Sequence, residues 1–60
     1  MMTTADKVRE LRRVRGWSQQ QLAERLGVAL PTVNRWENEG REPIRSIRQT
    51  LDRLFKKSGV

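Results

Sequence analysis

Apolar residues recur along the chain at intervals of three and four positions, which is the spacing of one face of an α-helix. No segment alternates apolar and polar residues in the way that a half-buried strand would. The apolar runs predict four helices, over about residues 4–15, 19–26, 30–37 and from 43 or 44 to 57. We therefore expect a compact all-α domain with short connections, built of four helices, or of five if a short extra turn forms.

Residues that are typical of helix ends support these boundaries. Thr3 or Thr4 can cap the first helix, because a hydroxyl oxygen accepts a hydrogen bond from the free N–H groups of a first turn. Ser18 and Gln21 have the spacing of a capping box at the start of the second helix. That helix should stop at Gly27, since glycine readily adopts the left-handed backbone that ends helices.

Each predicted helix has one apolar face, and we expect these faces to form the core. They comprise Val8, Leu11 and Val14; Leu22, Ala23 and Leu26; Ala29, Val33 and Trp36; and Ile44, Ile47, Leu51, Leu54 and Phe55. Trp17 is also expected in the core rather than as a ligand-stacking group. Residues 58–60 follow the last apolar position of the fourth helix, and we expect them to fray.

The outer face of the third helix differs from an ordinary solvated helix surface, which is rich in Glu and Lys. It is made of short polar side chains and one arginine: Pro31, Asn34, Arg35 and Asn38, with Leu30 and Thr32 at its edges. Gly27 interrupts the apolar pattern shortly before the third helix. Pro31 is tolerated in the first turn of that helix, because the N–H groups of a first turn have no partner within the helix. Two short helices joined by a tight glycine turn are typical of a helix-turn-helix. A plain helical bundle is equally consistent with this pattern alone.

A helix of this kind fits the major groove of DNA, where arginine can pair with guanine and asparagine with adenine. Small residues at the start of the helix would let its backbone approach the bases. Leu30 or Pro31 could then touch a thymine methyl group.

Charge and composition narrow the function further. The chain has 60 residues, enough for one small domain, and 13 Lys and Arg against 7 Asp and Glu give a net charge of +6. Such a basic domain is expected to bind an anion, most often nucleic acid, although the charge could also serve solubility alone. The chain has no Cys and no His, which excludes disulfides, zinc sites built on those residues and Ser-His or Cys-His nucleophiles.

Localisation and catalysis follow from what the sequence lacks. No apolar run approaches the roughly 20 residues of a membrane span, and the N-terminal residues lack the apolar core of a secretion signal. We therefore expect a cytoplasmic protein that is associated with the nucleoid when bound to DNA. The carboxylates are scattered and no Gly-rich phosphate loop occurs, so we expect no enzymatic activity, cofactor, metal or small-molecule ligand.

The pattern Gln19-x-x-x-Ala23-x-x-x-Gly27-x5-Val33-x-x-Trp36 resembles the helix-turn-helix of the Cro/C1-type (XRE, lambda-repressor-like) DNA-binding domains. The flanking stretches "LRRVRGWSQQQLAERLGV" and "RWEN" are similar to corresponding stretches of that family. The resemblance covers about residues 5–57 and places the motif at about residues 19–38. It implies that residues 1–60 form a single DNA-binding domain.

The resemblance also implies roles for individual residues. The base-reading positions of the family correspond to Leu30, Pro31 and Arg35, with Thr32 and Asn34 as neighbours, and its phosphate-contacting positions to Gln19, Asn38, Arg41 and Arg45. Arg12 and Glu37 match a pair that ties the first helix to the third, and Arg12 matches a position that can also contact a phosphate. The implied function is sequence-specific binding of double-stranded DNA by a transcriptional regulator, with the helix at about 30–37 in the major groove. The regulator would act as a homodimer, which could require DNA to form.

The chain departs from the family pattern at both ends of the third helix. Ala29 stands where a capping Ser, Thr or Asp is usual, and Glu39 takes the place of a glycine, with Gly40 following. Leu30 and Pro31 stand at positions where the family commonly has polar residues that contact the bases. The rival interpretation is a protein-interaction module, antitoxin-like or docking through its fourth helix, with weak and sequence-blind DNA binding.

Overall fold

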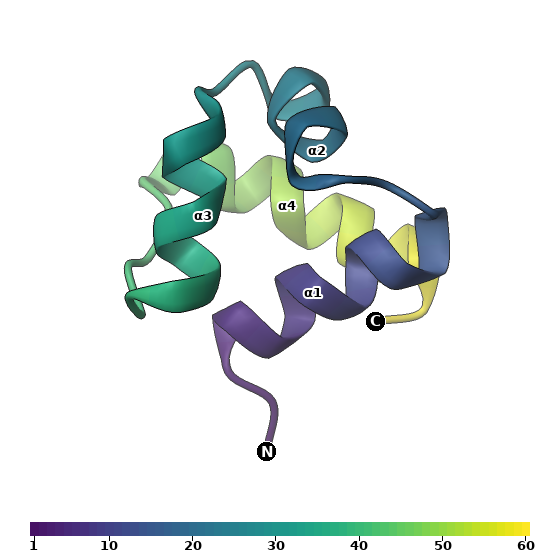
Figure 1. Cartoon of the computed structure of the whole chain (residues 1–60). Helices are drawn as coiled ribbons and strands as arrows, with labels where there is room; N and C mark the ends of the chain where they lie inside the picture. Colours follow the sequence, from purple (N-terminus) through teal and green to yellow (C-terminus); the bar gives the residue numbers. More distant parts are fainter.

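The computed structural model describes all residues 1–60 and contains four helices and no strand. The helices are α1 (Thr4–Arg15), α2 (Gln19–Leu26), α3 (Leu30–Asn38) and α4 (Arg45–Ser58), as labelled in Figure 1. The predicted all-α fold with four helices is confirmed, and the extra turn that would have made a fifth helix does not form.

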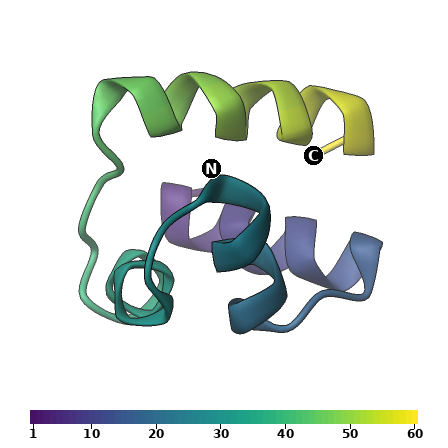
Figure 2. The same cartoon turned by 90° about the horizontal axis from the view of Figure 1, so that it is seen from above.

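The helices enclose one apolar core. In Figure 2, α4 extends along one side of the molecule, and α1, α2 and α3 lie on its inner side. α3 packs on α1 and α2, and α4 packs on α1 and α2 from the other side. The core residues come from all four helices: Val8, Leu11, Leu22, Ala23, Leu26, Val33, Trp36, Leu51 and Phe55.

Local capping sets the boundaries of α1 and α2. Thr3 accepts a hydrogen bond from the Asp6 N–H and donates its own backbone N–H to the Asp6 carboxylate, which completes a capping box. Ser18 and Gln21 form the same reciprocal arrangement at the start of α2, as the sequence predicts. Gly27 ends α2 with φ +70°, and its N–H binds the carbonyl groups of the preceding turn. The chain can therefore turn sharply into α3 (Figure 1).

The expectation that Val14, Ala29 and Ile44 belong to the core is wrong. Val14 is 46% exposed, because six residues of helix turn its side chain about 120° away from that of Val8. Ala29 and Ile44 are the residues that precede α3 and α4, and their backbones are extended instead of helical. The Ile44 side chain is consequently 71% exposed.

The expected fraying of residues 58–60 is also not found. Ser58 is the last residue of α4, and its hydroxyl accepts a hydrogen bond from Arg15 at 2.8 Å. Gly59 caps the helix, and the Val60 N–H donates to the Phe55 carbonyl at 2.8 Å, which places Val60 against the core. The last turn is thus held by contacts that join it to α1.

Gly27→Ala should destabilise the domain by about 1–2 kcal/mol, the cost of placing an L-residue in the left-handed region. A methyl group at this position would meet no atom within 4 Å, so the cost comes from the backbone conformation alone. Urea unfolding followed by circular dichroism measures the change. Gly27→Asn should lower the free energy of unfolding by less, because asparagine tolerates this conformation better than alanine does. Equal losses in the two variants would contradict this explanation.

Candidate nucleic-acid interface

The exposed strip of α3 is the surface around which the candidate site is built. Val33 and Trp36 are buried and hold the helix on the core. The side chains on the opposite face are exposed: Leu30, Pro31, Asn34, Arg35 and Asn38. Pro31 lies in the first turn of α3, and Ala29 provides no side-chain cap, so the start of this helix is apolar.

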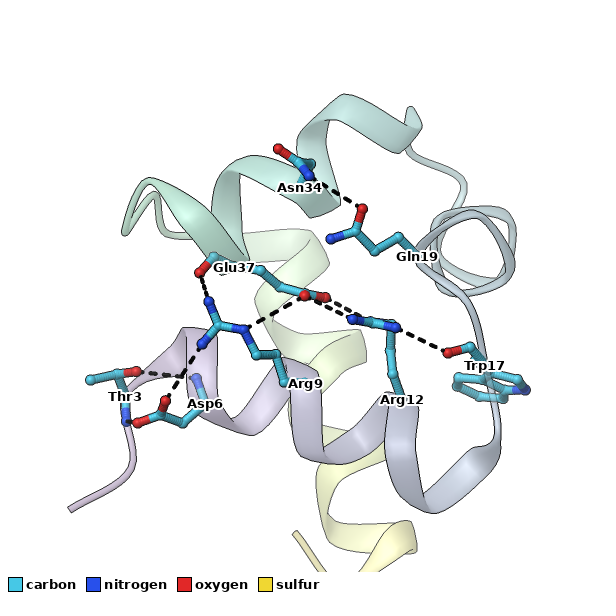
Figure 3. A network of polar contacts seen from close by, with 8 residues as sticks. All are labelled: Thr3, Asp6, Arg9, Arg12, Trp17, Gln19, Asn34 and Glu37. Carbon is cyan, nitrogen blue, oxygen red and sulfur yellow. Dashed lines mark hydrogen bonds and ion pairs between the residues drawn. The ribbon is translucent and has the colours of Figure 1, made fainter.

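Glu37, at the C-terminal end of α3, points inward and is only 5% exposed. The Arg12 guanidinium donates to both of its carboxylate oxygens, from Nε to Oε2 at 2.7 Å and from Nη2 to Oε1 at 2.9 Å. This bidentate geometry joins α1 to α3 (Figure 3). The structure therefore brings together the two residues that the resemblance paired.

A second arginine, Arg9, also holds Glu37. Its Nε lies 3.8 Å from Glu37 Oε1, and its Nη2 donates to the Glu37 backbone carbonyl. Asp6 in turn lies 3.7 Å from the Arg9 guanidinium. Arg9 was not expected at this site from the sequence, although Arg9 and Arg12 are three residues apart and therefore lie on one face of α1.

The environment of Glu37 keeps its carboxylate charged. Burial raises the pKa of Glu37, but hydrogen bonds from Arg12 and Gln19 and the positive charges of Arg12 and Arg9 outweigh burial, and the net shift is downward. The hydrogen bonds and charge of Glu37 likewise raise the pKa of Arg12, against the effect of burial. The acidic residue of α3 is thus neutralised within the protein instead of facing outward.

Arg12 has limited capacity left for another anion. Its Nη1 donates to the Trp17 carbonyl at 3.3 Å, in addition to the two bonds to Glu37. Two of the five guanidinium N–H groups remain, and the side chain is 24% exposed. A phosphate contact from Arg12 stays a prediction.

Gln19 and Asn34, both predicted site residues, lie side by side. Gln19 is the first residue of α2, after the Ser18 cap. The Asn34 side-chain nitrogen donates to Gln19 Oε1 at 3.3 Å (Figure 3). The positive end of α2 and the exposed strip of α3 are therefore connected by one hydrogen bond.

Three predicted arginines carry charge that no acidic side chain of the protein neutralises. Arg35, Arg41 and Arg45 are exposed and take part in none of the ion pairs, which instead involve Arg9, Arg12, Arg13 and Arg48. The Arg41 N–H donates to the Arg35 carbonyl at 3.3 Å, so the loop returns toward α3. Thr32 is partly buried and lines a groove of about 450 Å³ together with Arg35, Arg41 and Ile47.

The loop that carries Arg41 is held by a polar cluster that the sequence did not reveal. Thr4 donates to Glu42 at 2.8 Å, and Arg48 Nη1 donates to Thr4 at 2.9 Å and to Glu42 at 2.9 Å. The cluster joins the start of α1, the α3–α4 loop and α4. Thr4 is 38 residues from Glu42 and 44 residues from Arg48 in the chain, so no local pattern could have indicated the cluster.

The structure also shows how the departure from the family pattern at Glu39 is accommodated. Glu39 ends α3 with φ −117°, and its N–H donates to the Arg35 carbonyl at 2.9 Å. The left-handed conformation falls on Gly40, with φ +66°. The left-handed residue of the turn therefore lies one position later than in the family pattern, and the backbone of Glu39 is not strained.

The two tryptophans differ in their surroundings. Trp36 is in the core, as predicted, whereas Trp17 is half-buried and packs on its edge. The guanidinium groups of Arg25 and Arg15 lie 4.9 Å and 5.7 Å from the Trp17 ring centre, distances at which a cation is attracted to the ring. Trp17 thus lies beside two positive charges, one from the last turn of α1 and one from the last turn of α2.

A family model described as helix-turn-helix, of the Cro/C1 type, matches residues 8–43, more than half of the chain. The chain therefore belongs to this family of DNA-binding domains. No curated protein and no solved structure matches the chain significantly. None of the four helices has the length and hydrophobicity needed to span a bilayer.

Glu37→Gln should lower the free energy of unfolding at pH 7 by about 1.5–3 kcal/mol, because the charge-assisted bonds to Arg12 are lost. The lowered pKa of Glu37 means that the folded state holds the ionised carboxylate more strongly than the unfolded chain does. This contribution to stability is complete above the pKa of a glutamate in the unfolded chain, about 4.3. It disappears as the pH falls through the pKa of Glu37 in the folded protein. The difference between wild type and variant should therefore shrink below about pH 4.

Urea unfolding of both proteins between pH 3 and 7 checks this prediction. The pKa of Asp6 is lowered by its hydrogen bonds with Thr3, and that of Glu10 by its hydrogen bond with Arg13, so both also contribute to acid sensitivity. Only the difference between the two proteins isolates Glu37. Glu10→Gln, which breaks an exposed ion pair, is the matched control and should cost less. A difference that stays constant down to pH 3 would contradict the assignment.

Proposed function

We propose that this protein is a transcriptional regulator that binds specific sequences in double-stranded DNA. The observation that carries the proposal is the exposed strip of α3, which lies beside arginines without acidic partners. Arg35, Arg41 and Arg45 project positive charge from α3, the following loop and the start of α4. The one acidic residue within α3, Glu37, is turned inward and paired.

The strip and the arginines have separate tasks in this proposal. α3 enters the major groove, where Leu30, Pro31, Thr32, Asn34 and Arg35 face the base edges. The phosphate contacts are assigned to Gln19, Arg12, Asn38, Arg41 and Arg45. Phosphate contacts position the protein on the duplex, whereas base contacts select the sequence.

The proposal extends to the assembly on DNA. Residues 1–60 act as one domain that contains the helix-turn-helix at about residues 19–38. Two copies bind half-sites about 34 Å apart, with the dimer forming on DNA. We propose that the protein works in the cytoplasm at the nucleoid, without catalytic activity, cofactor or metal.

One surface feature favours the rival function, a protein-interaction module. Ile44 is 71% exposed and lines the groove beside α3, together with Val28 and Ile47. An exposed apolar residue next to a groove suits a protein partner. Selection of bound sites from a random DNA pool separates the two functions: an enriched palindromic motif supports the regulator, and the absence of any motif supports the module.

Arg35→Ala should weaken binding to the selected site by about 1–3 kcal/mol and relax the preference at one base position, because arginine reads guanine through two hydrogen bonds. Arg41→Ala should weaken binding to all DNA sequences alike and reduce the slope of log K against log salt by about 1. Fluorescence anisotropy with selected and scrambled duplexes at several salt concentrations measures both effects.

Lys57→Ala is the control, because it also removes one positive charge but does so in the last turn of α4. That end of α4 lies far from α3 (Figures 1 and 2). It should leave the base preference and most of the affinity unchanged. If Arg35→Ala keeps the full preference for the selected site, the role assigned to Arg35 is wrong.

A further inference from the structure

We infer that Gln19 fixes the orientation of the Asn34 amide, so that Asn34 presents an acceptor and a donor that together select adenine. This inference rests on the proposed function, since it concerns the same face of α3. It assigns Gln19 a positioning role in sequence readout, in addition to the phosphate contact proposed above.

The contact itself connects two helices. Asn34, in the middle of α3, donates from Nδ2 to Oε1 of Gln19, the first residue of α2, over 3.3 Å. Asn34 is exposed and Gln19 is partly buried between Asn34 and Glu37. Figure 3 shows the Gln19 nitrogen on the side of Glu37 and its oxygen directed at Asn34.

The orientation of the Gln19 amide follows from its position beside Glu37 (Figure 3). An ionised carboxylate can only accept hydrogen bonds, and Arg12 and Arg9 keep Glu37 ionised. The part of Gln19 that faces Glu37 must therefore be its NH2 group. The Gln19 oxygen is then left facing Asn34, and its hydrogen-bond donor within the protein is the Asn34 NH2 group.

The orientation of the Asn34 amide follows from that of the Gln19 amide. Its oxygen points away from Gln19 toward the outside of the molecule (Figure 3). Because Gln19 and the Asn34 oxygen lie on opposite sides of the Asn34 amide, we assign to Gln19 the amide hydrogen that points away from the oxygen. The other hydrogen then lies beside the oxygen. The outward edge of Asn34 consequently offers one acceptor next to one donor.

This edge discriminates among the four bases in the major groove. Adenine presents an N6 donor beside an N7 acceptor and matches both groups of Asn34. Cytosine presents only an N4 donor, and guanine O6 and thymine O4 are acceptors that would face the Asn34 oxygen. The expected order is adenine first, then cytosine, with guanine and thymine last.

Three variants test the inference: Asn34→Ala, Gln19→Met, which has a similar length without the amide, and Gln20→Met as the control at a neighbouring exposed position. Affinities are measured for a selected duplex in which each base pair is replaced in turn by the other three. In wild type, one position should prefer adenine over guanine. Asn34→Ala should abolish that preference. Gln19→Met should reduce it about three- to tenfold, the value of one hydrogen bond, because a freed amide can turn its NH2 group toward guanine.

The outcomes separate this inference from the proposed function. If wild type prefers no base at any position, both fail. If wild type has a motif but Asn34→Ala changes no position, or Gln19→Met lowers affinity equally for all bases, only the inference fails. In the free protein, the Asn34 side-chain NH2 resonances should shift in Gln19→Met and stay in place in Gln20→Met, and unchanged resonances in Gln19→Met would also overturn it.

Discussion

The contact between Glu37 and two arginines of α1 is the interaction on which the position of α3 and its exposed strip depends. It fixes the C-terminal end of α3 on α1 at the point where the apolar core ends. Trp36 secures the same turn of α3 from the core side. Because the carboxylate is nearly inaccessible to solvent, its charge is stabilised only by fixed partners, and any other position of α3 would leave a buried charge unpaired.

The same contact determines the electrostatics of the surface. An unpaired glutamate at position 37 would repel phosphate, but Arg12 and Arg9 pair with its charge within the protein. Glu39, which follows α3, is exposed and takes part in no ion pair. The arginines of α3 and the following loop remain uncompensated.

Helix positions could be predicted from sequence because capping is local, as the reciprocal bonds of Ser18 and Gln21 show. The exposure of Val14 could not be predicted from a regular apolar spacing, since each step of three residues turns the side chain further around the helix. The pairing of Arg12 with Glu37 was expected only from the family resemblance. The cluster of Thr4, Glu42 and Arg48 depends on the path of the whole chain and on side-chain conformations, which no short motif encodes.

The hydrogen bond between Gln19 and Asn34 has a consequence for how this surface can diverge among related helix-turn-helix domains. Leu30 and Arg35 are exposed and have no hydrogen-bonded partner on another helix, so they can be exchanged for other side chains at little cost in stability. Asn34 shares its amide with α2, and its exchange would leave the Gln19 oxygen without a partner. The outer positions of α3 are therefore free to evolve singly, whereas Asn34 and Gln19 are expected to change as a pair.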